Sequence, residues 1–221
     1  MKMIPDRTGR FRERPYYEIS ELEERSEQAI TVFLRERYGF DRIPVPTEAF
    51  TVLIERDAAD LDLSATLSDK EHDVFGVTYF LQGKKPHVRI LRELWEQSWR
   101  LNRLRTTLAH EYGHVLLHTW LYDRPDAPPG PQTCYWRTML PTAGVVDWME
   151  WQAGYLSGAL LMPETFIGRA VNAYFRSREI GRSIVRDSRE AAELAQRISL
   201  IFEVSLEAAT VRLSQLGFLS D

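Results

Sequence analysis

The segment His110-Glu111-Tyr112-Gly113-His114 constrains this chain more than any other. Its apolar flanks, TTLA before and VLLH after, predict that it lies on a buried helix. Residues four apart share one helix face, so both imidazoles can reach one metal ion while Glu111 projects toward the water that such an ion activates. Buried polar groups without partners are costly, and a bound metal removes that cost. The alternative, two exposed histidines on an ordinary helix, fits the apolar flanks less well.

A third metal ligand must come from another segment, because catalytic zinc sites usually combine three protein ligands with a water. Glu150 is the best candidate, since it lies in the next strongly helical segment, 36 residues after His114. Asp147 and Glu150 also stand three apart at a helix start, which is the spacing of a capping box, so capping alone is the alternative. We therefore predict that zinc binds at His110, His114 and Glu150. Glu111 would then act as the general base.

The order of expected elements predicts an α+β fold. Hydrophobic periodicity indicates helices over residues 17–38 and 95–118. Segments rich in β-branched and aromatic residues indicate strands at 51–55, 74–80 and 87–91. Five prolines within residues 122–146 predict a loop, and a helix over 147–161 precedes two or three more. We expect a small antiparallel sheet packed on the helix that carries the motif, followed by a helical C-terminal tail.

Length and composition support one structural unit. The chain has 221 residues, of which 44% are hydrophobic, enough for a sizeable core. We expect residues 1–46 to form a helical segment packed on a core made by residues 47–221. No stretch approaches the ~20 apolar residues of a membrane span, and the first residues lack the apolar core of a signal peptide, so we expect a cytoplasmic protein without a membrane partner. Cys134 is the only cysteine, which excludes an internal disulfide and a Cys-rich zinc knuckle.

Charge is segregated along the chain. Residues 16–79 carry 15 Asp and Glu against 6 Lys and Arg, whereas residues 82–105 carry 7 Lys and Arg against 2 Glu, with Trp95 and Trp99 among them. One interpretation is a solvated helix face. The other is a surface that binds single-stranded DNA, where basic groups meet phosphates and aromatic rings stack on bases. Its candidate residues are Lys84, Lys85, Arg100, Arg103 and Arg105.

Three blocks of the sequence carry a family resemblance. They are TLAHEYGHVLLH at 107–118, EWQAGYLSGALLMP at 150–163 and FEVSLEAATVRLSQLGFL at 202–219. In composition and order they resemble the ImmA/IrrE family of zinc metallopeptidases, over about residues 50–219. The resemblance implies a zincin-like domain, and it implies the same three ligands and the same catalytic glutamate as the helix spacing.

Two further positions are interpreted through this resemblance. Gly154 stands where relatives often have Asn or Asp, so another group must orient a ligand histidine here if that side chain normally does so. His118 is typical of the family but lies two helical turns from His110, turned about 80° around the helix, and is expected to support the ligands or to pack rather than to bind the same ion.

The resemblance also implies a biological role. Members of this family cleave helix-turn-helix repressors and thereby induce stress or anti-phage genes. The CapP branch, associated with anti-phage operons, responds to single-stranded DNA and holds its zinc with a cysteine at rest, which suggests Cys134 as an inhibitory fourth ligand in the Pro-rich loop. A buried apolar role for that cysteine is the alternative. Two other functions stay open: a DNA-binding regulator, although residues 187–221 carry only 3 Arg against 6 acidic residues, and a non-catalytic zinc-stabilised scaffold.

Overall fold

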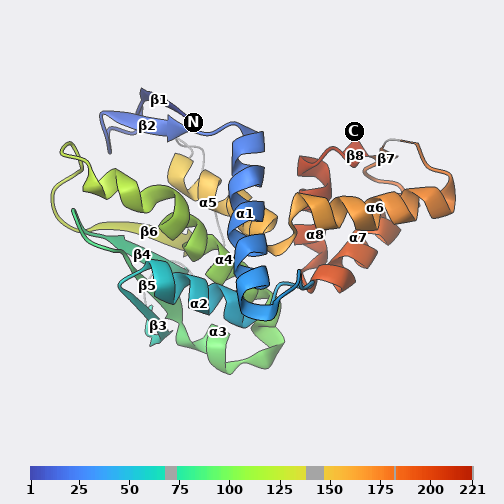
Figure 1. Ribbon diagram of the computed structural model, residues 1–221, viewed down its shortest axis with the longest axis horizontal. Coiled ribbons are helices and arrows are strands. Elements are labelled where there is room, and N and C mark those ends of the chain that lie inside the picture. Colours follow the sequence, from blue (N-terminus) through green and yellow to red (C-terminus); the bar gives the residue numbers. More distant parts are fainter. Residues whose placement is uncertain (68–73, 138–146, 182, 221) are drawn as a thin grey trace. The chain divides into compact units, whose positions relative to one another are not determined.

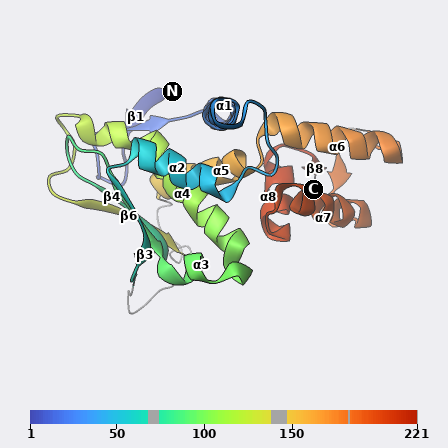
Figure 2. The ribbon, with the colours of Figure 1, turned by 60° about the horizontal axis from the view of Figure 1, so that its bottom comes forward.

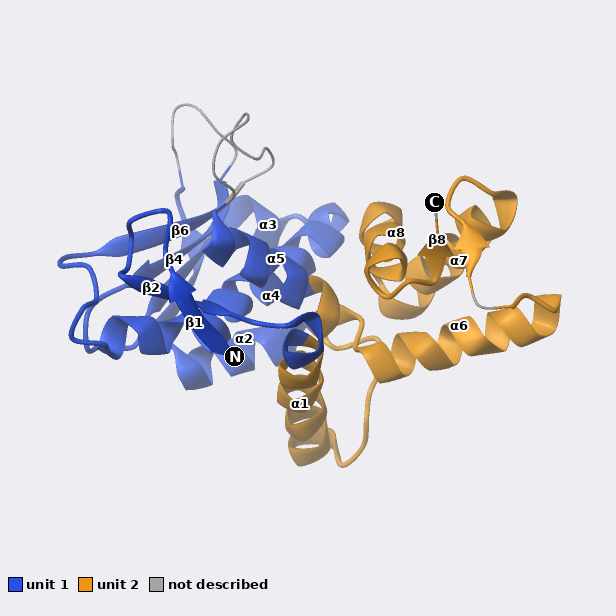
Figure 3. Cartoon of the chain, turned by 90° about the horizontal axis from the view of Figure 1, so that it is seen from above, with its two compact units in different colours: residues 1–22, 47–157 blue, residues 23–46, 158–221 orange. Residues whose placement is uncertain are grey.

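The computed structural model describes residues 1–67, 74–137, 147–181 and 183–220. The chain divides into two compact units (Figure 3): unit 1 is residues 1–22 and 47–157, and unit 2 is residues 23–46 and 158–221. One of its boundaries lies between Pro46 and Thr47. The boundaries after Leu22 and after Ser157 fall inside continuous helices, α1 (Ile19–Tyr38) and α5 (Trp148–Leu161). Helical periodicity in the sequence gives no signal of a unit boundary there.

Unit 1 contains a four-stranded sheet in the order β3-β5-β4-β6. Its strands are β3 (Asp60–Ala65), β4 (Val74–Phe80), β5 (His87–Leu91) and β6 (Gln132–Arg137). Strand β5 pairs antiparallel with β4, as expected, and β6 also pairs antiparallel with β4. Strand β3 pairs parallel with β5, so the sheet is mixed. A separate hairpin is formed by β1 (Lys2–Pro5) and β2 (Glu13–Tyr16).

Two expected elements of unit 1 are wrong. Residues 51–55 belong to a helix, α2 (Thr47–Asp57), and not to a strand. The helix buries Ala49, Phe50, Leu53 and Ile54, a spacing that suits one helix face. Residues 132–137 form strand β6 inside the segment expected to be loop, because the run QTCYWR pairs with β4 and places Cys134 opposite Thr78.

The helix that carries the motif is α4 (Leu101–His118), which follows α3 (Arg92–Glu96) and η1 (Ser98–Arg100). It lies against strand β4 (Figures 1 and 2), as expected for the motif helix. The 3-10 turn η2 (Thr119–Asp123) follows it. A buried hydrophobic cluster forms from residues of several elements of this unit: Phe11, Phe80, Leu121, Tyr122, Cys134, Trp148 and Met149.

Unit 2 holds the expected helical tail. Its elements are α6 (Glu164–Arg178), β7 (Ile184–Val185), α7 (Arg189–Phe202), α8 (Leu206–Gln215) and β8 (Leu219–Ser220). Ser188 and Ser205 cap α7 and α8 by accepting hydrogen bonds from backbone N–H groups of the first turn. Arg212 forms a buried bidentate ion pair with Glu23, with both N–O distances 2.6 Å. Within the described residues, no helix is long and apolar enough to cross a membrane.

Candidate metal centre

Three side chains from two helices of unit 1 converge on one point. His110 and His114 lie one turn apart on α4, and their Nε2 atoms are 3.1 Å apart. Glu150, near the start of α5, places Oε2 3.1 Å from His110 Nε2 and Oε1 3.4 Å from His114 Nε2. Both imidazoles are fully buried, and the carboxylate is 21% exposed. The structure therefore brings together the three residues predicted as zinc ligands.

The spacing of these atoms fits a tetrahedral metal ion. Ligand atoms 2.0–2.1 Å from a tetrahedral zinc lie about 3.3 Å from one another. The two Nε2 atoms are 3.1 Å apart, and each lies 3.1–3.4 Å from a different oxygen of Glu150. With one ligand atom taken from each residue, all three lie within 4.8 Å of one another. Two imidazole nitrogens and a carboxylate oxygen are also the donor types that zinc takes in hydrolases. One metal ion would accept a lone pair from each of the two imidazole nitrogens and from the carboxylate at once. Hydrogen bonds among the three groups cannot satisfy all of these lone pairs together.

The approach of α5 to α4 depends on Gly113. A Cβ placed on Gly113 would lie 3.2 Å from both Cα and the carbonyl oxygen of Ala153. Such contacts are tighter than ordinary van der Waals packing, and both atoms belong to backbone that cannot turn aside. The missing side chain thus lets the two helices come close enough for Glu150 to reach the histidines.

Glu111 lies beside the three ligands, pressed against strand β4. Thr78 Oγ1 donates a 2.6 Å hydrogen bond to Glu111 Oε2. Among the residues that the structure describes, Oε1 has no hydrogen-bond partner although it is buried. Gly76 makes room for this carboxylate, because a Cβ there would lie 2.5 Å from Oε1. Sequence reasoning found Glu111 but missed Thr78 and Gly76, which lie on a strand more than thirty residues earlier.

Burial dominates the electrostatics of the site. It raises the pKa of Glu111 to about 8 and lowers the pKa of His110 to about 4, the neutral form in which imidazole binds metals. His114 and Glu150 depart from this pattern. Burial alone would lower the pKa of His114, but Cys134 and Glu150 raise that pKa well above its usual value. Burial alone would raise the pKa of Glu150, but the neighbouring His114 and His110 hold that pKa well below its usual range. The site thus places the ionised carboxylate of Glu150 beside the carboxyl group of Glu111, whose pKa is about 8.

His118 touches a predicted ligand instead of standing apart from it. Its Nδ1 lies 3.1 Å from His114 Nδ1, and its Nε2 lies 3.0 Å from Gln152 Oε1. The expectation that His118 supports the ligands is therefore confirmed as a contact. Gln152, which sequence reasoning missed, lies on α5 two residues after Glu150. A Cβ added at Gly154 would meet nothing within 4 Å, so that position lies in open space.

Cys134 lies on strand β6, so the expectation that places it in a loop is wrong. Its side chain is 3% exposed and stands opposite Thr78 across the sheet. Burial raises the pKa of the thiol, against the opposing electrostatic effect of the neighbouring His114 ring. Cys134 is therefore held next to one of the three ligands by regular secondary structure.

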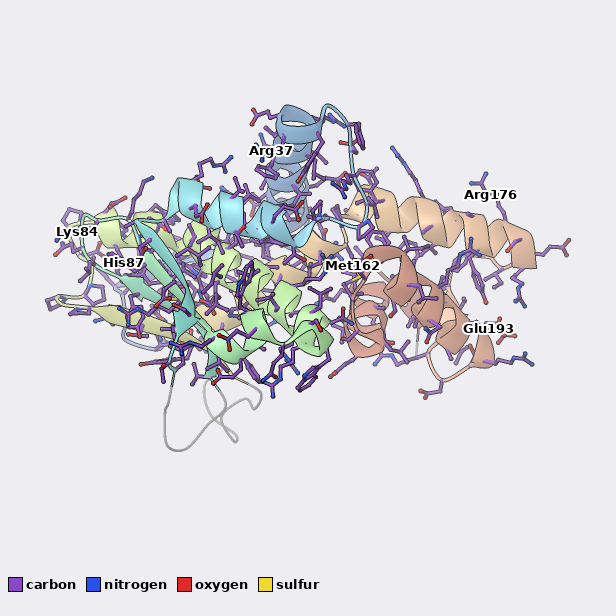
Figure 4. The ribbon with its side chains drawn as sticks, turned by 90° about the horizontal axis from the view of Figure 1, so that it is seen from below. Arg37, Lys84, His87, Met162, Arg176 and Glu193 are labelled. Carbon is purple, nitrogen blue, oxygen red and sulfur yellow. The ribbon has the colours of Figure 1, made fainter. Side chains whose placement is uncertain are left out.

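The five residues expected to bind single-stranded DNA do not form one surface. Arg105 is 1% exposed, and its guanidinium donates a hydrogen bond to Thr47 Oγ1, so it is excluded. Lys84 and Lys85 follow the end of β4 at Phe80 (Figure 4). Arg103 instead covers the ring of Phe75 at the opposite end of that strand, 5.0 Å from its centroid. Arg100 lies over the ring of the exposed Trp99.

A comparison with protein families bears on this geometry. The sequence pattern of the peptidase M78 family, described as the IrrE N-terminal-like domain, matches residues 96–214. The matched region covers more than half of the 221 residues and includes α4 and α5, which supply the three predicted ligands and Glu111. The comparison with curated proteins found no match.

Proposed function

We propose that this chain, which belongs to the IrrE N-terminal-like family of M78 metallopeptidases, is a zinc-dependent endopeptidase. The observation that carries the proposal is the convergence of His110, His114 and Glu150 on one buried point beside Oε1 of Glu111, which has no hydrogen-bond partner in the described part of the chain. A purely structural zinc site is closed by four protein ligands, whereas a catalytic site uses three and keeps one position open. The centre fits the catalytic pattern.

The residues of the site have separate roles in the proposed reaction. Bound zinc supplies Lewis acidity, which acidifies water and polarises a peptide carbonyl. Glu111 Oε1 accepts the proton of the attacking water and then delivers it to the leaving amine nitrogen. The hydrogen bond from Thr78 holds the other oxygen and so fixes the direction in which Oε1 points.

Removal of one ligand should abolish metal binding. We expect native mass spectrometry to find about one zinc per wild-type chain, and little zinc on His110→Ala or Glu150→Ala, because two remaining ligands hold zinc far more weakly than three. His87→Ala is the matched control, since that histidine lies on β5 and is no part of the cluster. Full zinc occupancy in Glu150→Ala would show that the third ligand is a different group.

The proposed substrate is a helix-turn-helix repressor whose cleavage induces stress or anti-phage genes. The support is the resemblance of the three sequence blocks to the ImmA/IrrE family, together with a site that can cut peptide bonds. Incubation of the zinc-loaded protein with a co-purified repressor should yield two fragments, and chelation should prevent this. Binding without cleavage would instead favour the non-catalytic scaffold, and direct binding to duplex DNA would favour the regulator.

We propose further that Cys134 is a fourth, inhibitory ligand in a resting state. The support is its electrostatic interaction with the ring of His114 and its burial on strand β6, at 3% exposure. A thiolate on the metal would take the position that water needs, at about 2.3 Å from zinc. Under reducing conditions Cys134→Ser should therefore keep its zinc and cleave faster than wild type. Equal basal rates would leave Cys134 as a packing residue.

Single-stranded DNA as an activator is proposed on a smaller surface than the sequence suggested. Trp95 and Trp99 are 49% and 75% exposed, and the Arg100 guanidinium lies 4.6 Å from the centroid of the Trp99 ring. Such a group can pair with phosphate while the rings stack on bases. The double variant Arg100→Glu/Arg103→Glu should bind an oligonucleotide more weakly, with a reduced dependence on salt. Lys84→Glu/Lys85→Glu is the charge-matched control, and equal affinity of the two variants would contradict this surface.

A further inference from the structure

A series of hydrogen bonds runs from the metal centre to the backbone of the N-terminal hairpin. His114 Nδ1 lies 3.1 Å from His118 Nδ1, and His118 Nε2 lies 3.0 Å from Gln152 Oε1. Gln152 Nε2 donates a 3.0 Å hydrogen bond to the carbonyl oxygen of Pro15 on β2. The two histidines are fully buried and Gln152 is 2% exposed, so water does not compete for these partners.

The Pro15 carbonyl fixes the direction of every bond in this series. A carbonyl oxygen only accepts, so the NH₂ group of Gln152 must face Pro15 and its Oε1 must face His118. That oxygen also only accepts, so His118 Nε2 carries the proton of the second bond. A neutral His118 then has a lone pair on Nδ1, and the third bond forms only if His114 Nδ1 carries a hydrogen.

The direction of these hydrogen bonds determines the protonation of the other ring nitrogen of His114, Nε2. With its proton on Nδ1, a neutral His114 has a lone pair on Nε2, the atom that faces His110 and Glu150. The reverse direction, from His118 to His114, would place the proton of a neutral His114 on Nε2 and block metal binding. The series therefore selects the one tautomer of His114 that can be a ligand, and it holds the ring in orientation.

We infer that His118 and Gln152 are positioning residues that prepare His114 for the metal, with Pro15 as the fixed end of the series. This inference rests on the proposed metal centre. His118 and Gln152 thus orient a ligand histidine, the role that the resemblance suggests for an Asn or Asp at position 154. Here that position is Gly154, where an added Cβ would meet nothing within 4 Å. The ring of Trp148 packs edge-on against His118 at 5.6 Å between centroids, which restricts the rotation of that imidazole.

The test compares two substitutions of the same size at one position. In His118→Asn, the side-chain oxygen can take the place of Nδ1 and still accept from His114, whereas His118→Leu has the same shape without an acceptor. Zinc affinity, measured by competition with a chelator, should fall about 10- to 100-fold in His118→Leu, the usual effect of removing such a partner. His118→Asn should recover most of that loss. The absorption bands of bound cobalt(II) should change in His118→Leu and resemble those of wild type in His118→Asn.

Gln152→Met keeps both histidines and tests the far part of the series should either histidine variant fail to fold. It should weaken zinc binding, and nitrogen NMR of wild type should find the His118 proton on Nε2. Equal zinc affinity in His118→Leu and His118→Asn, or a His118 proton on Nδ1, would overturn the inference. Thermal unfolding of the metal-free variants separates a loss of fold from a loss of ligand orientation. Absence of zinc from wild type would instead refute the metal centre itself, so the two failures are distinguishable.

Discussion

Glu111→Gln should lose proteolysis while it keeps about one zinc per chain. The amide has nearly the shape of the carboxylate, and its oxygen can still accept the hydrogen bond from Thr78 Oγ1. It cannot accept a proton from water, however, and a general base typically contributes about 10²- to 10⁴-fold to a rate. None of the three ligand atoms belongs to this side chain, so metal binding should persist. Cleavage rates and zinc content, measured on the same preparation, check both parts.

The control for this variant is Glu93→Gln, which makes the same chemical change on helix α3 and outside the metal centre. It should cleave at the wild-type rate. Turnover by Glu111→Gln equal to that of wild type, on any protein that wild type cleaves, would remove Glu111 as the base. Loss of zinc from Glu111→Gln would mean that the residue also shapes the metal centre.

The local part of the site was predictable because helix geometry alone places it. His110 and His114 stand four apart, so any helix through them brings their side chains together, whatever the rest of the fold does. Glu150 was predictable with help from the family resemblance, since its distance from the motif helix depends on how α5 packs. Gly113 fixes that packing through its contact with Ala153, which no local pattern reveals.

Tertiary contacts decided the features that sequence reasoning missed. The run TVLIE has the composition of a strand, yet its apolar residues pack as one face of helix α2 against α4. Arginine is a residue type usually found at the surface, yet Arg105 is buried and donates a hydrogen bond to Thr47 Oγ1. The bond between Gln152 and Pro15 joins residues 137 positions apart, and only the folded chain brings them together.

Gly76→Ala should reduce proteolysis nearly as much as loss of the base, without loss of zinc. The added Cβ would lie 2.5 Å from Oε1 and 2.9 Å from Cδ of Glu111. Strand β4 is fixed on both sides, since Gly76 pairs with Ile90 on β5 and with Trp136 on β6. The carboxylate is the more flexible group, so it should move away, lose the hydrogen bond from Thr78 and point in the wrong direction.

The measurement is kcat/KM beside zinc content and thermal unfolding. We expect a loss of about 10²-fold or more in kcat/KM, the lower range for a general base, and a destabilisation of about 1–3 kcal/mol from overpacking. Gly154→Ala is the matched control, because its Cβ meets nothing within 4 Å, and it should keep full activity. If the effect acts through Glu111, Gly76→Ala should lower the rate no further in a Glu111→Gln background. Wild-type activity in Gly76→Ala would show that the base tolerates displacement, and an additive loss in the double variant would place the effect on another group.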